Sequence, residues 1–150
     1  MTNGIVDRLS RCRTVHVDTQ AIIYLLEDRD PWLSVVTDLF AEIRPGGIRG
    51  TSSIVTLVEV LVKPLKEGRH DLANAYREVL LDAGAIYLIP LDRAVAECAA
   101  RIRAEHAFKI PDAVQLASAL SVGADVFVTN DVQLRRFTEI DVVLLDDFVA

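Results

Sequence analysis

Three short apolar runs constrain the fold of this chain more than any other feature. They are Val15-His16-Val17, Val126-Phe127-Val128 and Val142-Val143-Leu144. Runs that are apolar at almost every position suit strands covered on both faces, as in parallel sheets. Between them lie segments whose apolar residues recur at helical spacing, so that strands and helices alternate along the chain. This alternation predicts crossover connections and a parallel sheet.

The expected elements follow from these patterns and from the caps and turn residues beside them. Strands are expected at 14–17, 48–51, 85–89, 125–129 and 141–145, and helices at 19–27, 31–45, 53–63, 71–81, 93–106, 111–123 and 132–136. The length of 150 residues fits one domain. We therefore expect an α/β fold, a three-layer α/β/α sandwich with a mostly parallel sheet of about five strands. It forms a single domain over residues 1–150, in which 1–13 are an N-terminal extension.

The composition indicates whether the protein is folded and where in the cell it is expected. Hydrophobic residues make up 51% of the chain, which favours a packed core over disorder. No apolar run reaches the roughly 18 residues of a membrane span, and the first 14 residues lack the apolar stretch of a signal peptide. The two cysteines are too few for a disulfide framework. A cytoplasmic protein without membrane attachment is expected.

The net charge of −6 counts against a nucleic-acid-binding protein, because such proteins usually carry a basic surface. The objection weakens if several acids hold metal ions, since two divalent ions would add four positive charges where a substrate binds. Basic residues also gather within 63–70 and 101–109. These clusters suit either solvated helix faces or contacts with RNA.

Three acidic residues are predicted to meet at one edge of the sheet. Asp18 follows the first strand, Asp131 follows the strand at 125–129, and Asp112 stands in the first turn of a helix. In open α/β sheets, ligands bind beyond the carboxyl ends of the strands. Each acid alone could simply cap a helix or favour its dipole. Their common location favours a shared site.

Glu59 is the fourth acid. Its helix is apolar almost all round over 54–62, so it is expected to be buried. A buried carboxylate is costly unless it is paired or binds a metal. An ion pair with Lys63, one turn on, is the alternative. Because the acids offer hard oxygen ligands and no His/Cys cluster accompanies them, Mg²⁺ or Mn²⁺ is expected rather than zinc.

Four pieces of the sequence together resemble a known family. They are Val17-Asp18-Thr19, Thr51-Ser52-Ser53 leading to Glu59, Ile110-Pro111-Asp112-Ala113-Val114-Gln115-Leu116-Ala117-Ser118-Ala119, and Val128-Thr129-Asn130-Asp131 followed by Leu134 and Phe137. In their order and spacing, from about residue 14 to 148, the chain resembles a PIN domain, specifically the VapC-like toxins of bacterial type II toxin–antitoxin systems. The resemblance implies a metal-dependent endoribonuclease that forms a homodimer and is inhibited by a cognate antitoxin protein.

Carried over to this sequence, the resemblance implies that Asp18, Glu59, Asp112 and Asp131 are the catalytic and metal-binding set, with Thr129 in a supporting role. The expected reaction is hydrolysis of RNA by metal-activated water, leaving 5′-phosphate and 3′-hydroxyl ends. An apolar stripe within 22–40, which includes Trp32, could contact an antitoxin helix.

Other α/β families fit less well. A receiver domain needs a lysine near the end of a late strand, and none follows Thr129. A haloacid-type phosphatase needs Asp-x-Asp, whereas Asp18 precedes Thr19 and Gln20. A dinucleotide-binding fold needs glycines directly after the first strand. The alternative that stays open is a PIN-like protein that binds RNA or a partner without cleaving.

Overall fold

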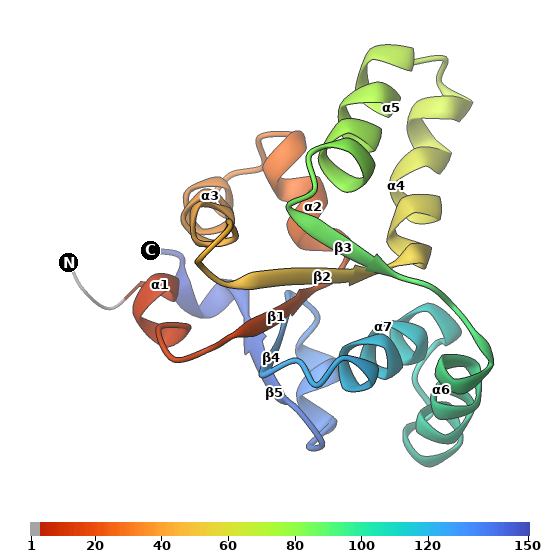
Figure 1. Ribbon diagram of the computed structural model, residues 1–150. Helices are drawn as coiled ribbons and strands as arrows, with labels where there is room; N and C mark the ends of the chain where they lie inside the picture. The colour runs from red at the N-terminus through yellow and green to blue at the C-terminus, as the bar shows by residue number, and fades with distance from the viewer. Residues whose placement is uncertain (1–3) are drawn as a thin grey trace.

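A parallel sheet of five strands organises the molecule, which is described for residues 4–150 in a computed structural model (Figure 1). The strands are β1 (Thr14–Val17), β2 (Arg49–Ser53), β3 (Ile86–Ile89), β4 (Val126–Thr129) and β5 (Asp141–Leu144). Their order across the sheet is β3-β2-β1-β4-β5, and every neighbouring pair is parallel. The predicted α/β class, the parallel sheet and its five strands are confirmed.

Helices cover both faces of this sheet. They are α1 (Ile5–Arg8), α2 (Thr19–Leu26), α3 (Leu33–Glu42), α4 (Ile54–Lys66), α5 (His70–Arg77), α6 (Arg93–His106) and α7 (Ile110–Ser121), with a π-helical turn (Glu78–Asp82) and two 3-10 turns (Val132–Arg136 and Leu145–Phe148). The first five pack on one face and α6 and α7 on the other (Figure 1). The molecule is thus the predicted three-layer sandwich.

Alternation along the strands divides the core into two halves. Val15 and Val17 of β1 are fully buried against the helices α1 to α5. Phe127 of β4 is buried with α6 and α7, and the ring of His16 stacks on it with centroids 5.2 Å apart. A polar ring therefore lies inside the second half of the core, which has consequences for the site.

Some element boundaries differ from those expected. Helix α4 continues through Pro64 to Lys66, although Pro64 has no N–H to donate to the carbonyl one turn before it. The helix expected at 71–81 divides into α5 and the π-helical turn. Strand β2 runs on to Ser53, whose hydroxyl caps α4 by accepting a hydrogen bond from the Val55 N–H at 3.1 Å.

The expected N-terminal extension packs against the rest of the domain over its described part. Ile5 and Leu9 are 2% and 1% exposed and belong to the core. Arg8 and Asp141 form an ion pair at 2.6 Å, which ties α1 to the start of β5. Residues 1–3 of the extension lie outside the described residues. Within 4–150, no helix combines the length and apolar character needed to cross a membrane.

Candidate metal-binding site

The order of the strands reverses at β1, which lies between β2 and β4. The crevice beyond the carboxyl ends of β1 and β4 is the place where ligands bind in open α/β sheets. Asp18 directly follows β1, and Thr129 is the last residue of β4. Because Val17 and Val128 are partners in the strand register, Asp18 and Thr129 stand level with each other at this crevice.

Asp18 is held by hydrogen bonds at both carboxylate oxygens. The Thr129 hydroxyl donates to one oxygen, and the Gln20 N–H donates to the other at 3.1 Å. Asp18 is only 8% exposed, and this burial raises its pKa to about 7 even though the hydrogen bonds favour the ionised form. The charge of Asp112 raises the pKa further. A buried carboxylate in this state gains from a nearby cation.

Asp131 and Asp112 reach the same crevice from the other side. Asp131 caps the 3-10 turn after β4, accepting from the Gln133 N–H at 3.0 Å, and its own N–H donates to the Thr129 hydroxyl oxygen at 3.1 Å. Asp112 lies in the first turn of α7. Its pKa is raised by burial and by the charges of Asp131 and Glu59. Asp112 therefore lies near enough to each of the other three predicted acids for their charges to interact.

Asp112 and Asp131 line a small hollow of about 170 Å³ beside the crevice. The same hollow is lined by Lys109 and Arg136. The Arg136 guanidinium lies 4.6 Å from the centroid of the Phe108 ring and donates to the His106 carbonyl at 3.2 Å. Two cations thus flank a pocket of acids, an arrangement suited to an anionic substrate bound through a metal ion.

The expectation that Glu59 is buried was wrong. Only one side of α4 packs against the domain, so Val60 is 3% exposed whereas Val58 and Val62 are 61% and 55% exposed. Glu59 lies on the exposed side. The alternative of an ion pair with Lys63 is not observed in the described chain. Instead the Thr19 hydroxyl donates to Glu59 Oε1 at 2.8 Å, which draws this carboxylate toward the crevice.

The donor set fits a hard divalent cation. The four acids come from separate elements and repel one another, and in residues 4–150 no Lys, Arg or His nitrogen lies within 4.0 Å of their oxygens. Carboxylate oxygens are the ligands that Mg²⁺ and Mn²⁺ prefer, and Mg²⁺ keeps several waters. In the described chain, no three of these acids bring their oxygens within 4.8 Å of one another.

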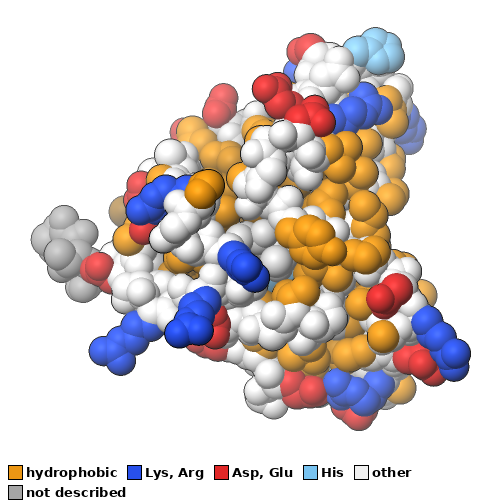
Figure 2. All heavy atoms as spheres, viewed as in Figure 1, with side chains coloured by type: hydrophobic (Ala, Val, Ile, Leu, Met, Phe, Trp, Pro, Cys, Tyr) orange, Lys and Arg blue, Asp and Glu red, His pale blue; other side chains and the backbone are white. Residues whose placement is uncertain are grey.

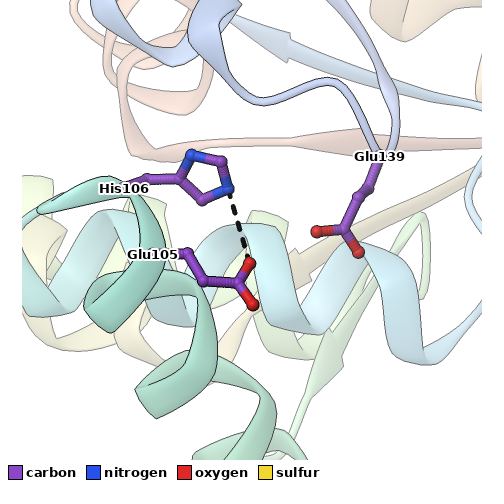
Figure 3. Close-up of side chains that lie close together, drawn as sticks. All are labelled: Glu105, His106 and Glu139. Carbon is purple, nitrogen blue, oxygen red and sulfur yellow. Dashed lines mark ion pairs between the residues drawn. The ribbon is translucent and has the colours of Figure 1, made fainter.

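A different cluster has closer ligand atoms but holds its own cation. Glu105, His106 and Glu139 lie within 4.8 Å of one another, with His106 Nε2 3.8 Å from a Glu105 oxygen (Figure 3). The Arg101 guanidinium bonds Glu105 at 3.1 Å and both oxygens of Glu139 at 2.9 and 3.0 Å. These ion pairs account for the cluster without a metal.

Sequence reasoning missed three polar residues beneath the crevice: His16, Thr19 and Gln115. They are linked by hydrogen bonds below Glu59. Their signal in the sequence was a polar residue interrupting an apolar run, as His16 does between Val15 and Val17. That pattern identifies a buried polar group but not its partners.

Trp32, which belongs to the apolar stripe that could contact an antitoxin helix, is half-buried. Its indole stacks on Tyr24 with ring centroids 4.4 Å apart, and its N–H donates to Asp146 at 2.7 Å. Trp32 therefore joins the start of α3 to the C-terminal 3-10 turn, and its polar atom already has a partner.

The sequence and the fold of this chain are similar to those of known proteins. The PIN-domain family matches residues 15–140. A chain of a toxin–antitoxin complex from Klebsiella pneumoniae is 23% identical, with a TM-score of 0.66, and the alignment covers 87% of this chain and 97% of that one. VapBC2 from Rickettsia felis, bound to a promoter DNA fragment, gives 14% identity, a TM-score of 0.69, and coverage of 87% and 98%.

A third solved structure is the toxin VapC20 from Mycobacterium tuberculosis, described as cleaving the sarcin–ricin loop. It is 19% identical, with a TM-score of 0.66, and the alignment covers 85% of this chain and 98% of that one. At these identities the likeness concerns the fold. A comparison with curated protein sequences found no match.

Proposed function

Because this chain belongs to the PIN-domain family, we propose that it is a metal-dependent endoribonuclease whose site is formed by Asp18, Glu59, Asp112 and Asp131. The observation that carries the proposal is the buried Asp18, whose pKa is raised to about 7 at the switch point of the sheet, beside Asp112, whose pKa is also raised. Perturbed carboxyl groups in a crevice are typical of functional sites. The named activity of VapC20, RNA cleavage, agrees with this reading.

Each acid has its own part in the proposed reaction. Asp18, Glu59 and Asp112 would hold the main ion, and Asp131 would help with a second ion or position the attacking water. Thr129 keeps Asp18 in place by donating to it. Bound Mg²⁺ or Mn²⁺ would supply a water of lowered pKa and neutralise charge on the phosphate. In the hydrolysis, the water oxygen would bond to phosphorus, the P–O3′ bond would break, and a proton would pass to O3′, leaving 5′-phosphate and 3′-hydroxyl ends.

Lys109 and Arg136 are placed to attract the RNA backbone. Both line the hollow that contains Asp112 and Asp131, and Lys109 forms no ion pair with any described residue. In a chain of net charge −6, such local cations and the bound metal together give the site its affinity for phosphate. The protein would act in the cytoplasm, where its RNA substrate is found.

We further propose that the protein is the toxin of a toxin–antitoxin pair. One of the similar structures is named as a toxin–antitoxin complex, and another is VapBC2 bound to promoter DNA. Helices α2 and α4 are in contact and carry half-buried apolar side chains, among them Ile23, Leu26, Leu57 and Leu61. An amphipathic antitoxin helix could cover these side chains beside the crevice.

A homodimer is the third part of the proposal. Val58, Val62 and Leu65 lie on one face of α4 and are 61%, 55% and 49% exposed, and Figure 2 shows hydrophobic side chains gathered along this helix. Between α6 and α7, a mostly apolar hollow of about 290 Å³ is lined by Leu91 and Ile110. Apolar surface of this kind marks an interface. Val62→Asp is expected to shift the protein from dimer to monomer in analytical ultracentrifugation.

The activity is tested with purified protein freed of any antitoxin, on structured and single-stranded RNA, with Mg²⁺, with Mn²⁺ and with chelator. Glu59→Gln should abolish cleavage, whereas Glu67→Gln, an exposed glutamate at the end of the same helix, should leave it intact. Cleavage that survives Glu59→Gln would contradict the assigned site. Metal-independent RNA binding without any cleavage would instead favour the alternative of a binding protein.

A further inference from the structure

A chain of buried polar side chains runs beneath the proposed metal site. His16, in the central strand β1, is fully buried. Its Nδ1 lies 2.9 Å from the Thr51 hydroxyl oxygen on β2, and its Nε2 lies 2.8 Å from Gln115 Oε1 on α7. The imidazole therefore bridges the sheet and the helix that carries Asp112. A polar ring in this position needs both partners, because an unpaired buried polar group is costly.

The chemistry of each partner fixes the direction of these hydrogen bonds. Gln115 Oε1 can only accept, so the hydrogen of His16 lies on Nε2. Nδ1 is then free to accept from the Thr51 hydroxyl. Because the Gln115 side-chain oxygen accepts from His16, the NH₂ of the same amide group points away from His16.

That NH₂ group points at two threonine hydroxyls. Gln115 Nε2 lies 2.7 Å from Thr56 Oγ1 and 3.5 Å from Thr19 Oγ1. Thr56 lies 2.7 Å from the Ser52 hydroxyl, which in turn donates to the Val17 carbonyl at 2.6 Å. Since Ser52 uses its only hydrogen on Val17, Thr56 donates to Ser52 and accepts from Gln115.

Thr19 is left with one hydrogen and two acceptors within reach. Glu59 Oε1 lies at 2.8 Å, whereas Thr56 Oγ1 lies at 3.3 Å. The shorter contact to an ionised oxygen is the stronger hydrogen bond. The Thr19 hydroxyl is therefore directed to Glu59, and the network ends on the one site acid that stands on an exposed helix face.

We propose that Thr19 and Gln115, anchored on His16, are positioning residues that hold the Glu59 carboxylate for metal binding. This inference rests on the proposed function, in which Glu59 is a metal ligand. An exposed glutamate on the outer side of α4 would otherwise sample several rotamers, and ordering it would oppose coordination. Partners that orient a ligating side chain in this way typically govern metal affinity by about 10- to 100-fold when removed.

Two further features support this assignment. Gln115 is 3% exposed and Thr56 is fully buried, so the inner part of the network is shielded from water that could replace its hydrogen bonds, and only its last bond, from Thr19 to Glu59, lies at the surface. It also spans three layers of the fold, from β2 through β1 to α7 and α4. The position of the Glu59 carboxylate is thereby coupled to the helix that presents Asp112.

The test measures Mn²⁺ affinity by electron paramagnetic resonance on RNA-free protein. Thr19→Val removes the donor but keeps the shape of the side chain, and it should weaken Mn²⁺ binding about 10-fold. Thr19→Ser restores the hydroxyl and should restore affinity to within about 2-fold of the wild type. Ser118→Ala, a buried hydroxyl on α7 outside the network, is the matched control and should bind Mn²⁺ like the wild type.

A double variant separates positioning from a general loss of structure. If Thr19 acts through Glu59, adding Thr19→Val to Glu59→Gln should weaken Mn²⁺ binding no further. Unchanged affinity in Thr19→Val, with affinity lost in Glu59→Gln, would overturn the positioning role and leave the proposed function standing. Unchanged affinity in both Glu59→Gln and Asp112→Asn would overturn the proposed metal site and the inference with it.

Discussion

Replacing Asp18 by asparagine should change how the stability of the metal-free protein depends on pH. Burial raises the pKa of Asp18 from 3.8 to about 7 in the folded state. Between these values the folded protein binds more protons than the unfolded chain, so the contribution of Asp18 to stability falls as pH rises. A pKa raised by about 3 corresponds to about 4 kcal/mol. Asparagine does not titrate, so this fall in stability with rising pH is absent in Asp18→Asn.

The contribution of His16 to stability changes with pH in the opposite direction. Burial lowers its pKa from 6.5 to about 4, so its contribution is complete above pH 6.5 and is lost as pH falls toward 4. This amounts to about 3 kcal/mol over the same window. In the wild type the contributions of His16 and Asp18 largely cancel between pH 4 and 6.5. Asp18→Asn leaves the His16 contribution alone, so the stability of the variant should rise with pH.

Urea unfolding in the presence of chelator, followed by circular dichroism from pH 4 to 7.5, measures this directly. The free energy of unfolding of Asp18→Asn, minus that of the wild type, should increase by about 4 kcal/mol across the range. Adding Mg²⁺ at pH 7.5 should stabilise the wild type and leave the variant unchanged. If the difference in free energy of unfolding between Asp18→Asn and the wild type did not depend on pH, burial would not raise the pKa of Asp18, and the reasoning would be refuted.

Two further changes test the packing around the site. Ser118→Ala should raise the free energy of unfolding, measured in urea, by about 1 kcal/mol. The reason is that the buried Ser118 hydroxyl has no hydrogen-bond partner among the described residues. A lower free energy of unfolding in the variant would mean that this hydroxyl does have a hydrogen-bond partner. Gly50→Ala should lower the same free energy by about 1–3 kcal/mol, because its Cβ would lie 2.7 Å from Ile86 Cδ1 and 2.8 Å from Ile43 Cγ2. A wild-type melting temperature for Gly50→Ala would contradict this close packing of β2.

The sequence was sufficient to place three of the acids because strand ends and helix starts are local features. Asp18 after β1, Asp131 after β4 and Asp112 at the start of α7 all follow from the alternation of apolar strands with helices. Once the sheet is parallel, its topology brings such positions to one edge. The supporting role of Thr129 was implied by the family resemblance, and the structure shows its hydroxyl donating to Asp18.

The burial expected for Glu59 was wrong, and its role in the site stays a prediction. The apolar pattern of α4 was interpreted as burial, but that helix lies at the side of the domain and exposes Val58 and Val62. A sequence cannot distinguish a buried helix from one whose second apolar face is free for a partner. Likewise, the contacts of His16 with Gln115 join residues 99 positions apart, so only the folded structure reveals them.

In the proposed function, the four acids bind a divalent ion on which RNA cleavage depends. The most direct test measures Mn²⁺ binding and RNA cleavage together in the wild type, in Asp112→Asn and in Asp71→Asn. Asp71 also stands in the first turn of a helix, but it lies far out in solvent, with its side chain 82% exposed. The account predicts that Asp112→Asn loses both Mn²⁺ binding and cleavage while Asp71→Asn keeps both. Wild-type binding and cleavage in Asp112→Asn would contradict it.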